Sequence, residues 1–307
     1  MTSAPHAIPK LVLGLVHESK SESEFESEHM PFSKFFKDWL KVQDQDLHEL
    51  MAIATAHSES AQSSTGPTQS HLSEHVSRVM SHYGNYYRDK LEAIKENVLL
   101  VLSPDWLSKL EDAFLWIGGW RPTIAFHLLY SKAGLQFEES LPELLTSGVT
   151  AGDLGDLSSQ QLVQVDELQR KTIREERKLT ESLAPIKRQL LTRSWSGFQK
   201  TITELTHSNE STQKSEFDSF QERVNKALAL KEHGLQEILV LTDELRYKTL
   251  KSVVDILSPI QAVHFLIATT QHHLRVHEWG IKKDEDDKTE REARGLAGPK
   301  PDNKPKS

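Results

Sequence analysis

The histidines are the residues of this sequence best suited to binding chemistry. The chain has fifteen histidines and no cysteines, which excludes disulfides, thiolate metal sites and cysteine nucleophiles. His273 and His277 are four residues apart, so on a helix they project from one face at adjacent turns. Two imidazoles placed in this way can bind zinc, copper or a haem iron, but a lone pair lacks the three or four ligands of a protein metal site. The alternative is that both rings pack and hydrogen-bond in the core near Trp279.

No pattern of catalytic residues is complete. His277-Glu278 resembles the start of the His-Glu-x-x-His motif of zinc proteases, but Ile281 stands where the second histidine is required. The glycines at positions 148, 152 and 155 follow no strand-like run, and no Gly-Lys-Ser/Thr appears, so they do not form a phosphate-binding loop. Because a nucleophile, a base and a cofactor cradle never coincide in one motif, an enzyme is the least expected class of function.

A second candidate site is the arginine of a tryptophan- and glycine-rich motif. The distinctive residues of this motif are Trp116, Gly118, Gly119, Trp120, Arg121 and Pro122. A planar guanidinium among aromatic rings could stack on them, or it could bind a carboxylate or a phosphate. The structural alternative is that Arg121 pairs with Glu111 or Asp112. We interpret the motif as a structural or partner-binding element.

The elements that carry these residues are predicted to be helices. Apolar residues recur every three or four positions in most segments, and no segment alternates convincingly with the period of two that is typical of a strand. The fold class is therefore all-α, a multi-helix bundle of roughly eight to ten helices with several long antiparallel amphipathic members. The expected helices cover residues 31–54, 71–102, 104–117, 123–130, 136–145, 158–186, 216–229, 231–257 and 259–280.

Capping residues indicate where several helices begin. Ser103 and Ser258 each precede a proline, which places an N-cap serine before a proline at the first helical position, where the missing N–H costs nothing. Ser158 is followed three residues later by glutamine, which is the reciprocal capping pattern. The glycine pair at positions 118 and 119 is expected to end or bend the helix at 104–117.

Aromatic residues on two of these helices are interpreted as core residues. In the helix at 31–54, phenylalanines and Trp39 recur at helical spacing opposite the lysines, and binding to calmodulin or another groove-binding partner is the alternative. In the helix at 71–102, three tyrosines have the spacing of core residues with polar tips rather than of a surface that stacks on nucleic acid. Lys90 on the same helix is expected to face solvent.

Composition divides the chain into three regions. Residues 1–30, in which serine and glutamate alternate over positions 17–29, are expected to be a disordered acidic arm, with a phosphorylated or partner-binding tail as the alternative. Residues 31–280 form the helical domain, and residues 281–307 are expected to be a disordered charged tail. The net charge of −8 argues against nonspecific binding to nucleic acid. No apolar run reaches the length of a membrane span.

Three long motifs resemble one protein family. LEDAFLWIGGWRPT, GDLSSQQLVQVDELQRKTIREE, and SPIQAVHFL with HLRVHEWG closely resemble the Delay-of-Germination-like family of plants, whose domain is also the C-terminal domain of TGA-type basic-zipper transcription factors. The resemblance runs from about Phe32 to Trp279. It implies regulation of transcription or of seed dormancy in the nucleus and cytoplasm, through partners such as type 2C protein phosphatases or basic-zipper factors. It also implies possible haem binding through His273 and His277.

Three hypotheses follow from these observations. The first is a non-enzymatic regulatory protein that presents a helical surface to protein partners. The second is a haem-binding sensor that uses the histidine pair. The third is a sequence-specific, DNA-associated transcription regulator. An acidic arm, rather than a basic region and a leucine zipper, precedes Phe32, so autonomous zipper-type DNA binding is not expected.

Overall fold

The computed structural model describes residues 32–60, 68–147, 153–205 and 210–294. Within these residues the chain is helical and contains no strand, which confirms the all-α fold class. The acidic arm predicted at residues 1–30 lies outside the described residues. The helices are α2 (Phe32–Ser60), α3 (Gln69–Glu96), α4 (Val98–Leu102), α5 (Lys109–Ala113), α6 (Ile124–Ser147), the 3-10 turn η1 (Leu154–Asp156), α7 (Ser159–Leu205), α8 (Glu210–Ile256) and α9 (Pro259–Ala293).

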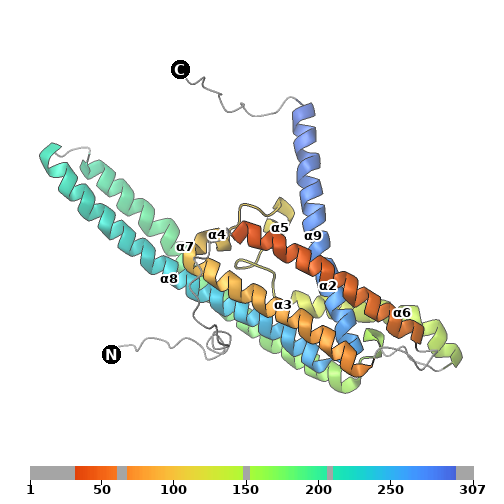
Figure 1. The fold of residues 1–307 in the computed structure, drawn as a ribbon. Coiled ribbons are helices and arrows are strands. Elements are labelled where there is room, and N and C mark those ends of the chain that lie inside the picture. Colours follow the sequence, from red (N-terminus) through yellow and green to blue (C-terminus); the bar gives the residue numbers. More distant parts are fainter. Residues whose placement is uncertain (1–31, 61–67, 148–152, 206–209, 295–307) are drawn as a thin grey trace, which may run out of the picture.

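Long helices packed side by side form the body of the molecule. The helices α7 and α8 make an antiparallel hairpin, and one end of this hairpin extends well beyond the other helices (Figure 1). The helix α3 lies against both α8 and α9, and α2 packs on α9 and α3. None of the described helices has an apolar stretch long enough to span a lipid bilayer.

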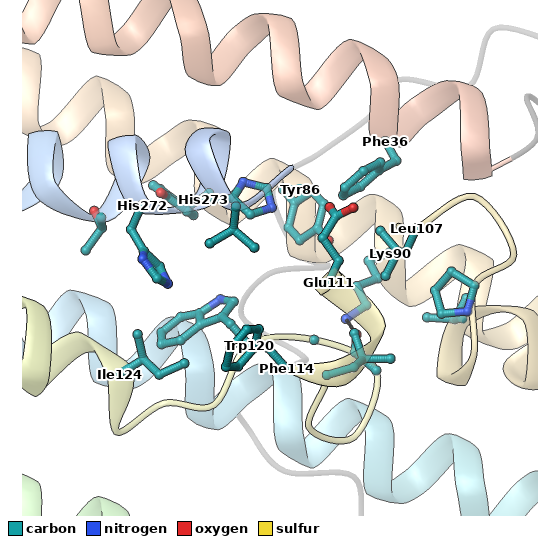
Figure 2. Close-up of a pocket in the computed structure, with 18 of the residues that line it drawn as sticks. Phe36, Tyr86, Lys90, Leu107, Glu111, Phe114, Trp120, Ile124, His272 and His273 are labelled. Atoms are coloured by element: carbon teal, nitrogen blue, oxygen red, sulfur yellow. Dashed lines mark hydrogen bonds between the residues drawn. The ribbon is translucent and has the colours of Figure 1, made fainter. Parts of the chain in front are cut away.

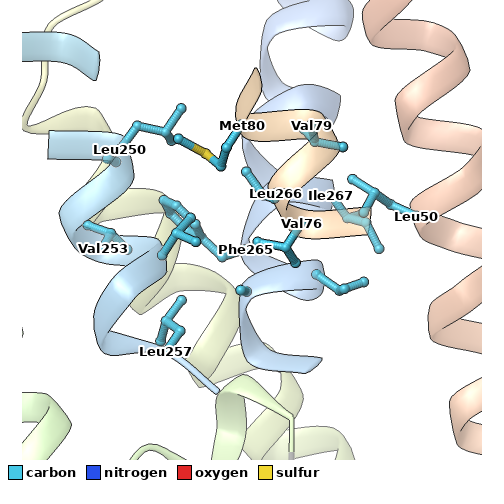
Figure 3. Packing of buried hydrophobic residues seen from close by; sticks show 14 of the residues in the cluster. Leu50, Val76, Val79, Met80, Leu250, Val253, Leu257, Phe265, Leu266 and Ile267 are labelled. Atoms are coloured by element: carbon cyan, nitrogen blue, oxygen red, sulfur yellow. The ribbon is translucent and has the colours of Figure 1, made fainter. Parts of the chain in front are cut away.

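The main core lies where four helices converge. Figure 3 shows Leu50 of α2, Met80 of α3, Val253 of α8 and Leu266 of α9 pointing toward one another. Phe265 at the centre of this cluster has no solvent exposure. A second, smaller cluster joins the end of α3 and α4 to α7 and α8; its buried members are Ile94, Val98, Val101, Ile117, Leu183, Leu235, Ile238 and Leu239.

Two of the three predicted helix starts are confirmed. The Ser258 hydroxyl accepts a hydrogen bond from the Gln261 N–H at 3.4 Å, and the Gln261 side chain accepts one from the Ser258 N–H at 3.0 Å. Ser158 and Gln161 make the same reciprocal pair, at 3.2 and 2.9 Å. Both helices therefore begin where their capping residues satisfy N–H groups that have no partner inside the helix.

The predicted start at Ser103 is wrong. Ser103 ends α4, because a residue before a proline disfavours the helical conformation. The next helix, α5, begins only after Ser108, whose side chain forms a capping box with Glu111. The buried helix expected at residues 104–117 is therefore a single five-residue helix between irregular segments.

Several predicted helix boundaries differ from the structure. The helix expected at 71–102 is divided at Asn97, whose side-chain oxygen accepts from the Leu100 N–H at 3.0 Å and caps α4. The separate helices predicted at 123–130 and 136–145 are one helix, α6, and those at 216–229 and 231–257 belong to α8. The last helix continues past the expected end at Gly280 to Ala293, so residues 281–293 are helical rather than irregular.

Candidate functional site

The centre of the site is a buried group of charged residues that we call the basic cluster: Lys90 of α3 with Asp243 and Arg246 of α8. The Lys90 Nζ donates to Asp243 Oδ1 at 2.9 Å, and the Arg246 guanidinium donates to the same oxygen. The side-chain exposure is 2% for Lys90, 8% for Asp243 and 0% for Arg246. Two cations thus share one carboxylate away from water.

The loop between α5 and α6, residues 114–123, accepts further hydrogen bonds from both cations of the basic cluster. The Arg246 Nε donates to the Trp120 carbonyl at 2.6 Å, and its Nη2 donates to the carbonyls of Ile117, at 2.9 Å, and Trp116. The guanidinium also lies 5.5 Å from the centre of the Trp116 ring. Lys90 donates to the Gly118 carbonyl at 2.7 Å. The loop is therefore held by its own carbonyls, which turn inward onto two buried cations.

This contact explains the glycine pair of the motif. Gly118 has φ +68°, a left-handed conformation that other residues adopt only with strain. A Cβ at Gly119 would lie 2.9 Å from the Arg246 Cζ, too close for any side chain. The two glycines let the backbone turn and approach the guanidinium, whereas the preceding helix has already ended at Ala113.

The basic cluster was missed by the sequence analysis, and the prediction that Lys90 faces solvent is wrong. A signal was present, because Lys90 falls in the same three- and four-residue steps as the buried Tyr83, Tyr87 and Ile94. Asp243 and Arg246 fall between the buried Leu239 and Leu250 in the same way; like Lys90, they are charged residues within an apolar stripe. Burial, and then repulsion from Arg246, lower the pKa of Lys90 to about 8, while Asp243 opposes this shift.

Arg121 pairs with a residue that the sequence analysis did not name. Its Nε donates to Glu176 of α7 at 2.8 Å, so the predicted pairing with Glu111 or Asp112 is wrong. The Glu176 side chain is fully buried and also accepts from the Thr123 N–H at 2.7 Å. The start of α6 is therefore tied to α7. The cation that stacks on a tryptophan is Arg246, not Arg121.

The tryptophans of the motif make specific hydrogen bonds to three different helices. The Trp120 indole N–H donates to the Tyr87 hydroxyl of α3 at 2.9 Å, and the Trp116 indole N–H donates to Thr180 of α7 at 3.2 Å. With Arg246 on α8, the loop contacts α3, α7 and α8. The loop thus links three helices of the bundle through hydrogen bonds.

The histidine pair lies between α9, α2 and α5. His273 Nδ1 is hydrogen-bonded to Gln43 of α2, and His277 Nδ1 lies 2.8 Å from the Glu111 carboxylate of α5. Both rings pack edge-on against Phe36, with centroid distances of 6.1 and 6.0 Å. Trp279 is 64% exposed and so does not provide the packing we expected near it. No group of three metal-binding side chains occurs among the described residues.

Burial and hydrogen bonding set the charge state of this region. Burial lowers the pKa of His273 to about 4, so the ring is neutral at pH 7. Burial alone would raise the pKa of Glu111, but hydrogen bonds from His277 and Ser108 outweigh it and lower the pKa. At pH 7 the His273 imidazole is therefore neutral and the Glu111 carboxylate is ionised.

A cavity of about 170 Å³ separates the histidines from the basic cluster. Figure 2 shows Lys90 and Glu111 on one part of its wall and His272, His273 and Trp120 on another. The rest of the lining is mainly apolar and aromatic; it includes Phe32, Phe36, Tyr83, Tyr86, Trp106 and Phe114. Apolar walls with a few polar groups are typical of small-molecule sites.

The described arrangement does not fit a haem. The hydrogen bonds at both Nδ1 atoms are suitable, because histidines that ligate a metal are usually oriented through their other ring nitrogen. However, His277 is not part of the cavity wall, and a cavity of this volume accommodates a single small ring rather than a porphyrin. Haem would require the helices around the cavity to separate.

Comparisons with known proteins agree with the family resemblance. The family model DOG1, described as seed dormancy control, matches residues 46–131, which run from α2 into α6 and include Lys90, the α5–α6 loop and Arg121. Protein DOG1-like 3 of Arabidopsis thaliana is 26% identical over 256 residues, which cover 81% of this chain and 84% of that protein. Protein DOG1-like 1 of the same plant is 28% identical over 269 residues, covering 81% and 88%.

The likeness to transcription factors is partial. The wheat transcription factor HBP-1b(c38) is 32% identical over 120 residues, which cover 39% of this chain and 32% of that factor. The TGACG-sequence-specific DNA-binding protein TGA-2.1 of tobacco is 24% identical over 80% of this chain and 45% of its own length. Residues 46–131 thus match the DOG1 family model, and over about four fifths of its length the chain is similar to DOG1-like proteins.

Proposed function

We propose that this chain is a non-enzymatic regulatory protein that acts through protein partners in seed dormancy or another hormone-dependent developmental programme. The match to the domain described as seed dormancy control, together with the similarity to DOG1-like proteins, supports this proposal. The partners expected from the resemblance are type 2C protein phosphatases and basic-zipper factors, and the expected compartments are the nucleus and the cytoplasm.

The observation that carries the partner-binding function is the exposure of two large aromatic side chains near one junction. Trp279 of α9 and Phe114, at the end of α5, are each 64% exposed. Their two helices are joined by the hydrogen bond between His277 and Glu111 and by Lys109, which contacts Asp284. Exposed tryptophan and other aromatic residues are enriched among the residues that dominate protein interfaces. We therefore assign the partner face to the α5–α9 junction.

The aromatic face of α2 is a poorer candidate for this role. Phe36 and Trp39 are buried in the main core, so a calmodulin-like partner would have to draw them out of it. The exposed aromatics of the α5–α9 junction require no such rearrangement.

The test is direct binding of the purified protein to a purified type 2C phosphatase and to a TGA-type factor. Trp279→Ala is expected to weaken binding by about tenfold or more, as at an interface hot spot. Arg275→Ala, an exposed change on the same helix, serves as the control. Equal affinities for both variants would reject the assigned face, and no binding to either protein would reject the proposed partners. Salt-dependent retention on duplex DNA would favour the DNA-associated regulator instead.

Haem sensing is the alternative function; the orientation of His273 and His277 through their Nδ1 hydrogen bonds supports it, and it requires the helices around the cavity to separate when haem binds. Titration of the protein with haem, followed by absorbance, tests it beside the double variant His273→Ala/His277→Ala. A saturable Soret shift that is absent in a still-helical double variant would establish the site. The same shift in both proteins would assign the absorbance change to nonspecific binding.

A further inference from the structure

The cavity holds polar groups that the fold itself does not use. An ammonium group has three N–H donors, and within the described residues Lys90 makes two hydrogen bonds, to Asp243 and Gly118. The Trp106 indole nitrogen is buried and has no partner among the described residues. Both side chains line the cavity. Because a buried donor without an acceptor is costly, this wall favours a ligand that accepts hydrogen bonds.

Charge favours an anionic acceptor near Lys90. The basic cluster contains two cations and one carboxylate, so its formal charge is positive. Glu111, the carboxylate that lines another part of the wall, already accepts hydrogen bonds from Ser108 and pairs with His277. Among the described residues that line the cavity, Lys90 therefore carries a positive charge without a full counter-charge.

The volume and the walls limit the rest of the ligand. An apolar cavity of about 150 Å³ engineered in another protein binds benzene, and the present cavity is about 170 Å³. Tyr86, Trp120 and Phe36 belong to the wall and can contact an aromatic ring by stacked or edge-on packing (Figure 2).

We propose that this cavity binds a small aromatic carboxylate, with the ring among the aromatic side chains and the carboxylate at the Lys90 ammonium. The cavity borders the α5–α9 junction, because Glu111 and Phe114 also line its wall, but the inference does not rest on the proposed partners. Binding would give Lys90 a second counter-ion and would bring α2, α3, α5, α6 and α9 together around one ligand, since each of these helices supplies part of the wall.

The test compares two probes of similar ring size, benzoate and toluene, by calorimetric or ligand-observed NMR titration at pH 7. The wild-type protein is expected to bind benzoate at least about tenfold more tightly than toluene, as one charge-assisted hydrogen bond provides. Lys90→Met is expected to retain toluene binding and to lose the preference for benzoate. Met fills the space of the lysine stem, and the Asp243–Arg246 pair stays intact.

Two further variants make the outcome decisive. Val276→Phe, which fills the cavity from α9, is expected to abolish binding of both probes. Lys95→Met, at an exposed position of the same helix as Lys90, is expected to bind both probes as the wild type does. The proposal is overturned if wild type shows no preference for benzoate, if Lys90→Met keeps that preference, or if Val276→Phe still binds. If Lys90→Met does not fold, the wild-type preference and the Val276→Phe result decide.

Discussion

Lys90 of α3 and Asp243 of α8 form an ion pair across 153 residues of sequence, with 2.9 Å between Nζ and Oδ1 and both side chains buried. Arg246 on the next turn of α8 contacts the same carboxylate. One acidic side chain is therefore shared by two cations between α3, α8 and the α5–α6 loop.

Removal of that carboxylate should be severely destabilising. Asp243→Asn leaves two buried cations without a counter-ion, so we expect the free energy of unfolding to fall by about 3–5 kcal/mol. Urea unfolding followed by circular dichroism measures the change. The matched control on the same helix is Asp255→Asn, which breaks an exposed pair with Lys251 and should cost less than about 1 kcal/mol. Similar losses in the two variants would contradict the role of the basic cluster.

Substitution of two neighbouring glutamates on α7, Glu175 and Glu176, should change the stability of the protein by very different amounts. Glu176→Gln weakens three contacts of a fully buried carboxylate, with Arg121 and with the N–H and hydroxyl of Thr123, and should destabilise the protein by about 1–3 kcal/mol. Glu175→Gln affects only an exposed pair with Lys178 and should change stability by less than about 0.5 kcal/mol. Thermal unfolding of the two variants provides the comparison. A larger loss at Glu175 would show that the tie between α6 and α7 is not important for stability.

Two glycines should respond to alanine with opposite signs. Gly118→Ala forces a side chain into a left-handed conformation with its Cβ 3.1 Å from the Val101 carbonyl, so we expect a loss of about 1–2 kcal/mol. Gly134→Ala lies within α6 in open space and should stabilise the protein by up to about 1 kcal/mol. Chemical denaturation of both variants checks the signs, and stabilisation by Gly118→Ala would disprove the strain argument.

Stability should fall on mild acidification because of His273. Its pKa is lowered from 6.5 to about 4 in the folded protein, chiefly by burial, so the unfolded chain binds a proton more readily. The contribution of His273 to the free energy of unfolding is fully present above pH 6.5 and is lost as the pH falls toward 4. A shift of 2.5 pKa units corresponds to ~3 kcal/mol. Burial shifts His264 and His272 in the same direction, and Glu111 adds a loss below its ordinary pKa.

Urea unfolding between pH 7 and pH 4 tests the assignment of this slope. His273→Gln cannot gain the proton and should flatten the decline between pH 6.5 and 4, leaving the smaller contributions of the other groups. An unchanged slope in the variant would assign the acid sensitivity to residues other than His273.

The fold class followed from local periodicity, but the site did not. The caps at Ser158 and Ser258 were predictable because a capping pair lies within four residues. The start at Ser108 was missed because Ser103 before a proline carried a competing signal, and the turn that separates them depends on packing. Helical periodicity could have predicted that Lys90 is buried. Its partner Asp243 could not be predicted in this way, because it lies 153 residues further along the chain.

The histidine pair shows the same limit. Spacing correctly placed His273 and His277 on one side of α9, since both rings pack on Phe36. Their hydrogen-bond partners, Gln43 and Glu111, come from α2 and α5, and no sequence pattern links these positions. A cavity likewise depends on how several helices meet, so its place could not be read from any one of them.

The helix α8 is continuous from Glu210 to Ile256, a length of about 70 Å at 1.5 Å per residue. Asp243 and Arg246 lie close to one end, and the opposite end lies in the part of the hairpin that extends beyond the bundle (Figure 1). The basic cluster thus holds α8 near one end, and most of the helix extends away from it toward the tip of the hairpin. A tilt of about 5° at Arg246 would move Glu210, roughly 54 Å away, by about 5 Å. A small tilt of α8 at Arg246 would therefore appear as a displacement of several ångströms at the tip of the hairpin.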